Sequence, residues 1–138
     1  MELETTALLR EIKRPSSVEG LPITHATARK IRSHVFANFK THHHYEDEEN
    51  FYDLRHRVDQ GIQMLDGRKP DSWLLVSHGI TIKMLVARLV FGKLLTPKLF
   101  VRIIETWRTE NTGITVCQWQ HRKWNLEVWN DSAHLGEV

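Results

Sequence analysis

The stretch Trp-Leu-Leu-Val-Ser-His-Gly at residues 73–79 decides the fold class that the sequence predicts. Its first five residues form a short, continuous apolar run ending at Ser77, which is typical of a strand buried on both faces. Gly79 follows, and residues 80–91 are mainly apolar with spaced cations, which predicts a helix that ends at Gly92. A strand that leads directly into a helix indicates an α/β domain.

Two further helices are predicted upstream of this stretch. Apolar residues recur at helical spacing from Thr24 to about residue 40, with Thr24 as the N-cap. Residues 49–65 carry one apolar stripe, and the glycine and proline within residues 67–71 predict where that helix stops. Residues 7–12 are interpreted as a short extended piece.

Downstream, residues 97–105 are predicted to form a short helix. Residues 113–119 and 123–129 are rich in β-branched and aromatic side chains and are joined by a polar turn, which predicts an antiparallel hairpin. Strands mixed with helices in this order favour a layered α/β domain.

The composition suits one globular domain and excludes several classes of function. The chain has 138 residues, of which 41% are hydrophobic and 26% are charged, so a core can form. The net charge of +2 gives no strong attraction to nucleic acid or to a membrane surface. Cys117 is the single cysteine, so no internal disulfide can form. With no signal peptide and no apolar span recognised, we expect a cytoplasmic protein.

His78 and Gly79 are the first candidate site residues. They lie where the predicted strand ends, and α/β proteins place ligands at that edge of a sheet. A phosphate there would meet an imidazole, an open glycine N–H and the positive end of the following helix. The alternative is a turn histidine without a functional role.

Glu11 is the second candidate, at the end of a short extended piece and close to three cations. A carboxylic acid in a partly buried site can act as a general acid. The alternative is a solvated loop with ordinary ion pairs. Two later stretches, at residues 111–115 and 130–135, have on their own the composition of turns at the ends of strands.

Five short motifs in a fixed order make the sequence similar to the later part of a bacterial-type histidine phosphatase (phosphoglycerate mutase-like) domain. The resemblance runs from about Leu8 to Leu135. The motifs are Leu-Arg-Glu-Ile-x-Arg-Pro-Ser at residues 9–16, Asp-Glu-Glu-Asn-Phe at 47–51, Val-Ser-His-Gly-Ile at 76–80, Asn-Thr-Gly-Ile-Thr at 111–115 and Asn-Asp-Ser-Ala-His-Leu at 130–135. The resemblance implies a single, incomplete domain over residues 1–138. Its expected fold is the three-layer α/β/α fold of phosphoglycerate mutases, truncated at the N-terminus and ending in an antiparallel hairpin.

The resemblance also implies a phosphoryl-transfer site that needs no metal and no cofactor. In this family a histidine in an Arg-His-Gly tripeptide attacks the phosphoryl group, and arginines bind the phosphate. By position, His78 matches the second histidine and Glu11 the proton donor, while Gly79 would present its N–H to the phosphoryl oxygens. The implied ligand is a phosphorylated small molecule or a phosphoprotein, and neither nucleic acid nor a membrane is expected as a partner.

The Arg-His-Gly tripeptide does not occur in this sequence. The nearest string, Leu-Arg-His-Arg at residues 54–57, lies in a predicted amphipathic helix, and His56 is interpreted as a helix-surface residue. Three accounts stay open: a fragment of a phosphatase, a degenerate domain, or a domain that a separate chain completes. We therefore expect the chain alone to be inactive, with an exposed strand edge that favours self-association or a complementing chain.

Parts of the sequence also fit other classes of function. A non-catalytic module could bind anions at His78 and Gly79 or add a partner strand at the open sheet edge. His42–His44 with Asp47–Glu49 could bind a metal, although the spacing matches no standard zinc site. The tryptophans of the hairpin could form a nucleic-acid platform, but core and edge packing is the favoured role.

Overall fold

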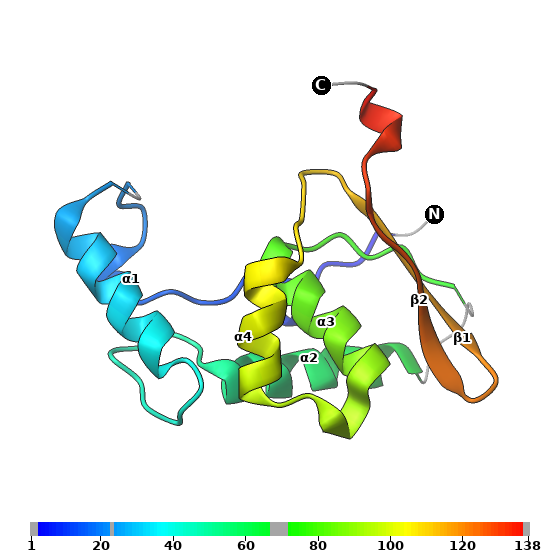
Figure 1. The fold of residues 1–138 in the computed structure, drawn as a ribbon, viewed down its shortest axis with the longest axis horizontal. Helices are drawn as coiled ribbons and strands as arrows, with labels where there is room; N and C mark the ends of the chain where they lie inside the picture. Colours follow the sequence, from blue (N-terminus) through cyan, green and yellow to red (C-terminus); the bar gives the residue numbers. More distant parts are fainter. Residues whose placement is uncertain (1–2, 23, 67–71, 137–138) are drawn as a thin grey trace.

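The computed structural model describes residues 3–22, 24–66 and 72–136. Within them the chain is a mixed α/β structure with four α-helices and one antiparallel two-stranded hairpin (Figure 1). The elements are α1 Ala26–Asn38, α2 Phe51–Asp66, α3 Gly79–Phe91, α4 Pro97–Thr106, β1 Ile114–Gln120 and β2 Lys123–Asp131. Four short 3₁₀ turns, at Ala7–Leu9, Ser16–Val18, Gly92–Leu94 and Ala133–Leu135, join them.

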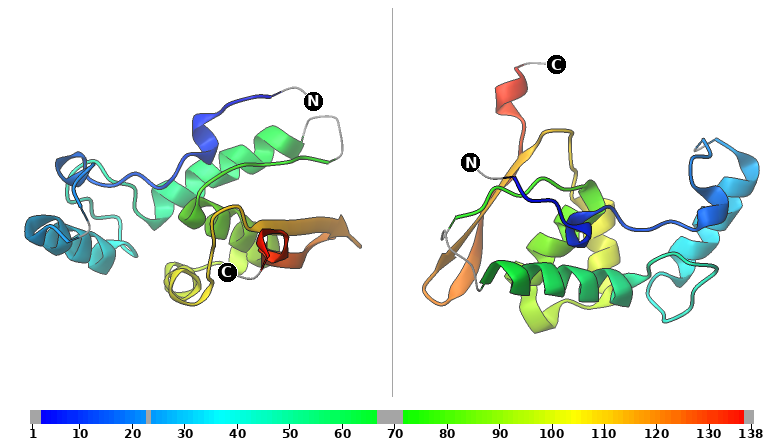
Figure 2. Two further views of the ribbon diagram at one scale, coloured as in Figure 1. Left: turned by 90° about the horizontal axis from the view of Figure 1, so that it is seen from above. Right: turned by 180° about the vertical axis from the view of Figure 1, so that it is seen from behind.

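The main core lies where α2, α3 and α4 pack together, while α1 lies apart from them (Figures 1 and 2). Phe51 and Phe100 are fully buried there, with ring centroids 5.9 Å apart. Phe39, just after α1, joins the same cluster and ties that helix to the body. Burial of these large apolar side chains is the main source of stability for the part that carries the site.

Three helix predictions downstream of residue 48 are confirmed in type and nearly in extent. The helix predicted over 49–65 is α2, that over 80–91 is α3, and that over 97–105 is α4. Gly92 ends α3 with φ of 52°, a conformation that glycine adopts without strain. The stop signals within residues 67–71 lie outside the described residues.

The N-cap predicted for α1 is wrong. His25, not Thr24, caps the helix, and its ring accepts a hydrogen bond from the N–H of Ala28 at 3.5 Å. Thr24 is one residue N-terminal to the N-cap, because the helix begins at Ala26. The extended piece predicted over residues 7–12 is also only partly right, because Ala7–Leu9 form a 3₁₀ turn.

The strand predicted at residues 73–77 is wrong. Residues 72–78 run as an extended segment that belongs to no strand, with Leu74 78% and Val76 84% exposed. A strand requires hydrogen-bonding neighbours on its edges, and in the described part of the chain only β1 and β2 pair with each other. The apolar run is therefore present without the sheet that would bury it.

The predicted hairpin is confirmed. Strands β1 and β2 pair antiparallel, with Trp119 opposite Trp124. The two residues of the tight turn, His121 and Arg122, both have positive φ (51° and 64°), as expected for the two-residue turns that match the twist of a hairpin. The hairpin contacts α3 through β2. No helix in the described residues has both the length and the apolar character of a membrane span.

Candidate functional site

The segment from Leu8 to Lys13, here called the strap, is held by side chains rather than by a β-ladder. Arg57 of α2 donates from Nη1 to the carbonyl of Leu8 at 2.8 Å and to the carbonyl of Arg10 at 3.0 Å. A guanidinium offers five donors in a fixed plane, so it can hold two carbonyls and a carboxylate at once. Arg57 thus fixes the strap just before Glu11.

Two hydroxyls from the other side of the strap complete this arrangement. Ser77 donates from Oγ to the carbonyl of Leu9 at 2.7 Å, and Thr81 donates from Oγ1 to the carbonyl of Arg10 at 2.7 Å. The segment before α3 therefore lies beside the strap (Figure 2). The carbonyls of Leu9 and Arg10 thus accept hydrogen bonds from Ser77, just before His78 in the sequence, and from Thr81, just after it.

Glu49 is the buried carboxylate on which this network converges. Its oxygens accept from Arg57 Nε at 2.7 Å and Nη2 at 2.9 Å, and from the two terminal nitrogens of Arg10 at 3.0 Å each. The N–H of Lys13 donates to it at 2.9 Å. Burial alone would raise the pKa of Glu49, but the hydrogen bonds and charge of Arg57, the Lys13 amide and Arg10 outweigh it and lower that pKa.

The carboxylate of Glu11 lies on the first turn of α3. Its Oε1 accepts from the N–H of Ile12 at 2.9 Å and of Thr81 at 3.3 Å, and its Oε2 from the N–H of Ile80 at 3.4 Å. Helix N-termini have unpaired N–H groups and a positive dipole end, which favour a carboxylate. Glu11 thus meets Ile80 and Thr81, which follow it by 69 and 70 residues in the sequence.

His78 and Gly79 lie at the same end of α3 as the Glu11 carboxylate. His78 is exposed, occupies the N-cap position, and makes no capping bond with its side chain. Within the described residues the N–H of Gly79 has no hydrogen-bond partner. A Cβ at Gly79 would come within 3.0 Å of Thr109 Oγ1, which favours glycine here.

The helix end is occupied differently from the sequence-based expectation. That expectation gave the N–H groups at the start of α3 to a bound phosphate, whereas Glu11 takes those of Ile80 and Thr81. The physical reason is that a nearby carboxylate satisfies the same unpaired donors as a phosphate would. His78 and the N–H of Gly79 remain as the groups that can reach an anion at this end.

Lys83 of α3 is a buried cation close enough to this carboxylate to interact with its charge. Burial lowers the pKa of Lys83, and the charge of Glu11 opposes that effect. Its Nζ donates to the carbonyl of Ile104 at 3.2 Å. The buried amine therefore adds positive electrostatic potential at Glu11.

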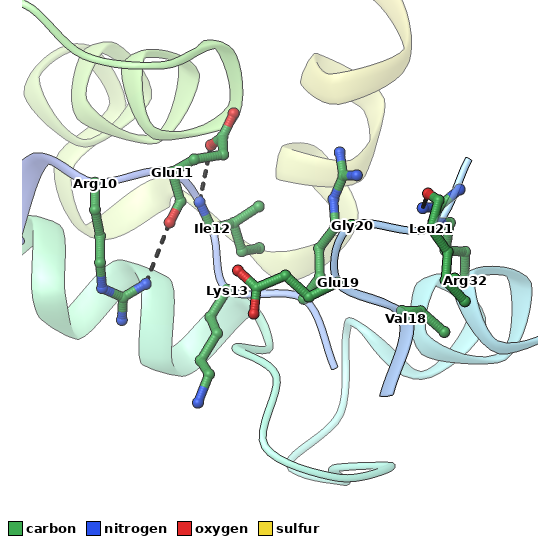
Figure 3. Close-up of a pocket in the computed structure, with 10 residues that line it drawn as sticks. Arg10, Glu11, Ile12, Lys13, Val18, Glu19, Gly20, Leu21 and Arg32 are labelled. Carbon is green, nitrogen blue, oxygen red and sulfur yellow. Dashed lines mark hydrogen bonds between the residues drawn. The ribbon is translucent and has the colours of Figure 1, made fainter. Parts of the chain in front are cut away.

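A pocket of about 750 Å³ opens beside Glu11, between the strap and α1 (Figure 3). Glu11 and Lys13 lie on one side of it and Arg32 of α1 on the other. Arg32 donates from Nη2 to the carbonyl of Leu21 at 2.9 Å, while its Nε and Nη1 are buried without a hydrogen-bond partner among the described residues. A ligand bound at Glu11 can extend into this pocket. Its lining residues are Arg10, Glu11, Ile12, Lys13, Arg14, Val18, Glu19, Gly20, Leu21 and Arg32.

The two late motifs, at residues 111–115 and 130–135, pack against each other. Asn130 accepts through Oδ1 from the N–H of Glu110 at 2.8 Å, and a side chain at Gly113 would collide with that same oxygen. A second pocket of about 580 Å³ lies between these segments and includes Thr109, the neighbour of Gly79. The late motifs thus lie next to the N-terminal end of α3.

The histidine-rich connector does not gather its ligands around one point. His44 pairs with Asp53 at 2.7 Å, Asp47 binds Lys13 Nζ at 2.6 Å, and Glu49 binds Arg57. Among the residues that the structure describes, no group of three or more His, Cys, Asp or Glu could hold a metal ion. These side chains are engaged in ion pairs and hydrogen bonds instead.

Comparison with known protein families gives a match over nearly the whole chain. The family model described as "Histidine phosphatase superfamily (branch 1)" matches residues 1–132. No curated protein and no solved structure gives a significant match. The matched range includes the strap, the start of α3, the late motif at residues 111–115 and the first three residues of the motif at 130–135.

Proposed function

The chain belongs to the histidine phosphatase superfamily, branch 1, and from this membership we propose that Glu11, His78 and Gly79 are part of a phosphoryl-transfer site for phosphomonoesters. The observation that carries the proposal is the meeting of Glu11 with the turn that holds His78 and Gly79, although the two segments are far apart in sequence. Phosphoryl transfer depends on positioned charge and on protonation of the leaving oxygen, and these groups supply both.

Each residue has a role in this proposal. His78 hydrogen-bonds a phosphoryl oxygen through its exposed ring, and the N–H of Gly79 donates to a second oxygen. Glu11 protonates the leaving alkoxide, which leaves far more readily as an alcohol. The ligand is a phosphorylated small molecule or a phosphoprotein that reaches the site from the cytoplasm.

The attacking histidine is the part that these 138 residues do not supply, since no Arg-His-Gly tripeptide occurs among them. We propose that the chain is one incomplete domain of the three-layer α/β/α fold, and that a complementing segment or chain provides the missing strand and nucleophile. The exposure of Leu74 and Val76 supports this, because an apolar extended segment is normally covered by neighbouring strands.

We predict that the purified chain does not hydrolyse p-nitrophenyl phosphate above the background rate. Without a nucleophile the remaining groups can bind the phosphoryl group but cannot form a phosphohistidine. The measurement is release of p-nitrophenolate by the wild type and by His78→Ala. Turnover that disappears in His78→Ala contradicts the prediction, whereas turnover that is equal in both variants identifies a contaminating phosphatase.

One specific observation favours a second candidate, a non-catalytic interaction module. Residues 72–78 are extended, outside any strand, and expose Leu74 and Val76 to solvent. An extended segment with free edge groups can accept a partner strand by β-augmentation. In this alternative the partner strand binds there and the chain binds no phosphomonoester.

A further inference from the structure

Thr81 is a polar residue with no solvent exposure (0%) in the first turn of α3. A threonine inside a helix commonly returns its hydroxyl hydrogen bond to the carbonyl four residues earlier. Thr106 of α4 does so, with Oγ1 at 2.7 Å from the carbonyl of Arg102. Thr81 instead directs its hydroxyl out of its own helix, to the carbonyl of Arg10 on the strap at 2.7 Å. The hydroxyl therefore links two segments.

Thr81 also contacts the carboxylate of Glu11 through two atoms. Its N–H donates to Glu11 Oε1 at 3.3 Å, and its Oγ1 lies 3.4 Å from the same oxygen. A hydroxyl has one hydrogen, and the shorter distance to Arg10 shows where that hydrogen lies. Together with Arg57, which donates to the same Arg10 carbonyl at 3.0 Å, the Thr81 hydroxyl fixes the peptide next to Glu11, while the Thr81 amide holds one oxygen of the Glu11 side chain.

The two oxygens of Glu11 are consequently unequal. Oε1 accepts from the N–H groups of Ile12 and Thr81, so it is the oxygen that prefers to stay unprotonated. Among the described residues, Oε2 has one hydrogen bond, from the N–H of Ile80 at 3.4 Å, which is the longest of the three hydrogen bonds from backbone amides to this carboxylate. A proton on Glu11 therefore resides on Oε2, which is free to give it away.

We propose that Thr81 is the positioning residue for the proton donor: by fixing the Arg10 carbonyl and Glu11 Oε1, it presents the protonated Oε2 to the leaving oxygen of the substrate. In the transfer step the O–H bond at Oε2 breaks, the proton joins the leaving alkoxide, and the carboxylate that remains keeps its N–H donors on Oε1. This inference rests on the proposed role of Glu11 as proton donor.

Substitutions at Thr81 separate positioning from ordinary packing. Thr81→Val keeps the shape and the amide but removes the hydroxyl, and Thr81→Ser keeps the hydroxyl. Thr106→Val is the control, because it removes a threonine hydroxyl with the same 2.7 Å bond to a carbonyl of its own helix rather than of the strap. Circular dichroism and thermal melting establish the temperature at which each variant is fully folded.

The test is a pH titration of the ¹H–¹⁵N NMR signals of residues 80 and 81 in the full chain. In the wild type both amides are expected to shift as Glu11 gains a proton, and Glu11→Gln abolishes that response. Thr81→Val is expected to show a reduced response while folded, and Thr81→Ser and Thr106→Val retain the wild-type response. A full response in Thr81→Val, no Glu11-dependent response in the wild type, or a lost response in folded Thr81→Ser overturns the inference.

Should Thr81→Val fail to fold, Thr81→Ser alone decides the inference, since it retains the hydroxyl and must retain the response. Failure of the proposed function has a different signature. Inorganic phosphate added to the same samples would then leave the Gly79 amide unchanged, while the pH response of residues 80 and 81 still reports whether Thr81 positions Glu11.

Discussion

Replacing Arg57 with alanine is expected to lower the free energy of unfolding by about 3–5 kcal/mol, the usual result of removing one partner of a buried ion pair. The side chain of Arg57 is only 9% exposed and that of Glu49 10%. Without Arg57, the carboxylate of Glu49 loses two hydrogen bonds, and the carbonyls of Leu8 and Arg10 lose their shared donor. Urea denaturation followed by circular dichroism measures the change.

Arg10→Ala is the matched control for this prediction. Arg10 also forms a bidentate ion pair with Glu49, but its side chain is 43% exposed. Its removal is therefore expected to lower the free energy of unfolding by only about 0–1 kcal/mol. Equal losses of unfolding free energy in Arg57→Ala and Arg10→Ala would contradict the inference that the buried side chain of Arg57 holds the strap.

His78→Ala is expected to weaken binding of inorganic phosphate by at least about tenfold, since a charge-assisted hydrogen bond contributes about 1.5–3 kcal/mol. Because His78 is exposed and its ring makes no recorded hydrogen bond within the described residues, thermal stability is expected to stay unchanged. NMR titration of the wild type and of His78→Ala with phosphate, at one fixed pH, gives the ratio of dissociation constants.

His56→Ala provides the comparison for that experiment, since His56 is an exposed histidine of α2. It removes the same imidazole without touching the end of α3, so phosphate affinity is expected to match that of the wild type. If both variants bind phosphate as the wild type does, or lose it equally, His78 is not a phosphate ligand.

Local sequence pattern was sufficient for elements whose partners are close in the chain. The apolar stripes of α2, α3 and α4, the stop at Gly92 and the hairpin around residues 121–122 each depend on local periodicity or turn chemistry. The strand prediction for residues 73–77 was wrong because burial of a strand depends on neighbouring strands that are distant in the sequence. Its side chains do alternate, with Leu75 and Ser77 half-buried and Leu74 and Val76 exposed, so only one face is covered.

The supporting residues of the site were harder to foresee than Glu11 and His78. Arg57 was given no role, yet it lies three residues after Leu54 and four before Gly61, both buried, so it falls on the inner face of α2. That spacing was a usable signal for a buried arginine. Thr81 and Lys83 carried no such signal, because their roles depend on where the strap folds back onto α3.

The central claim, that Glu11, His78 and Gly79 face one bound phosphoryl group, is tested most directly by a crystal structure of the chain with tungstate, a phosphate analogue. The account predicts the anion at the start of α3, at hydrogen-bonding distance (about 2.7–3.2 Å) from the N–H of Gly79 and a ring nitrogen of His78, with Glu11 Oε2 turned toward it. Tungstate bound only elsewhere, such as against Arg14 and Arg32, or no bound tungstate at all, would contradict it.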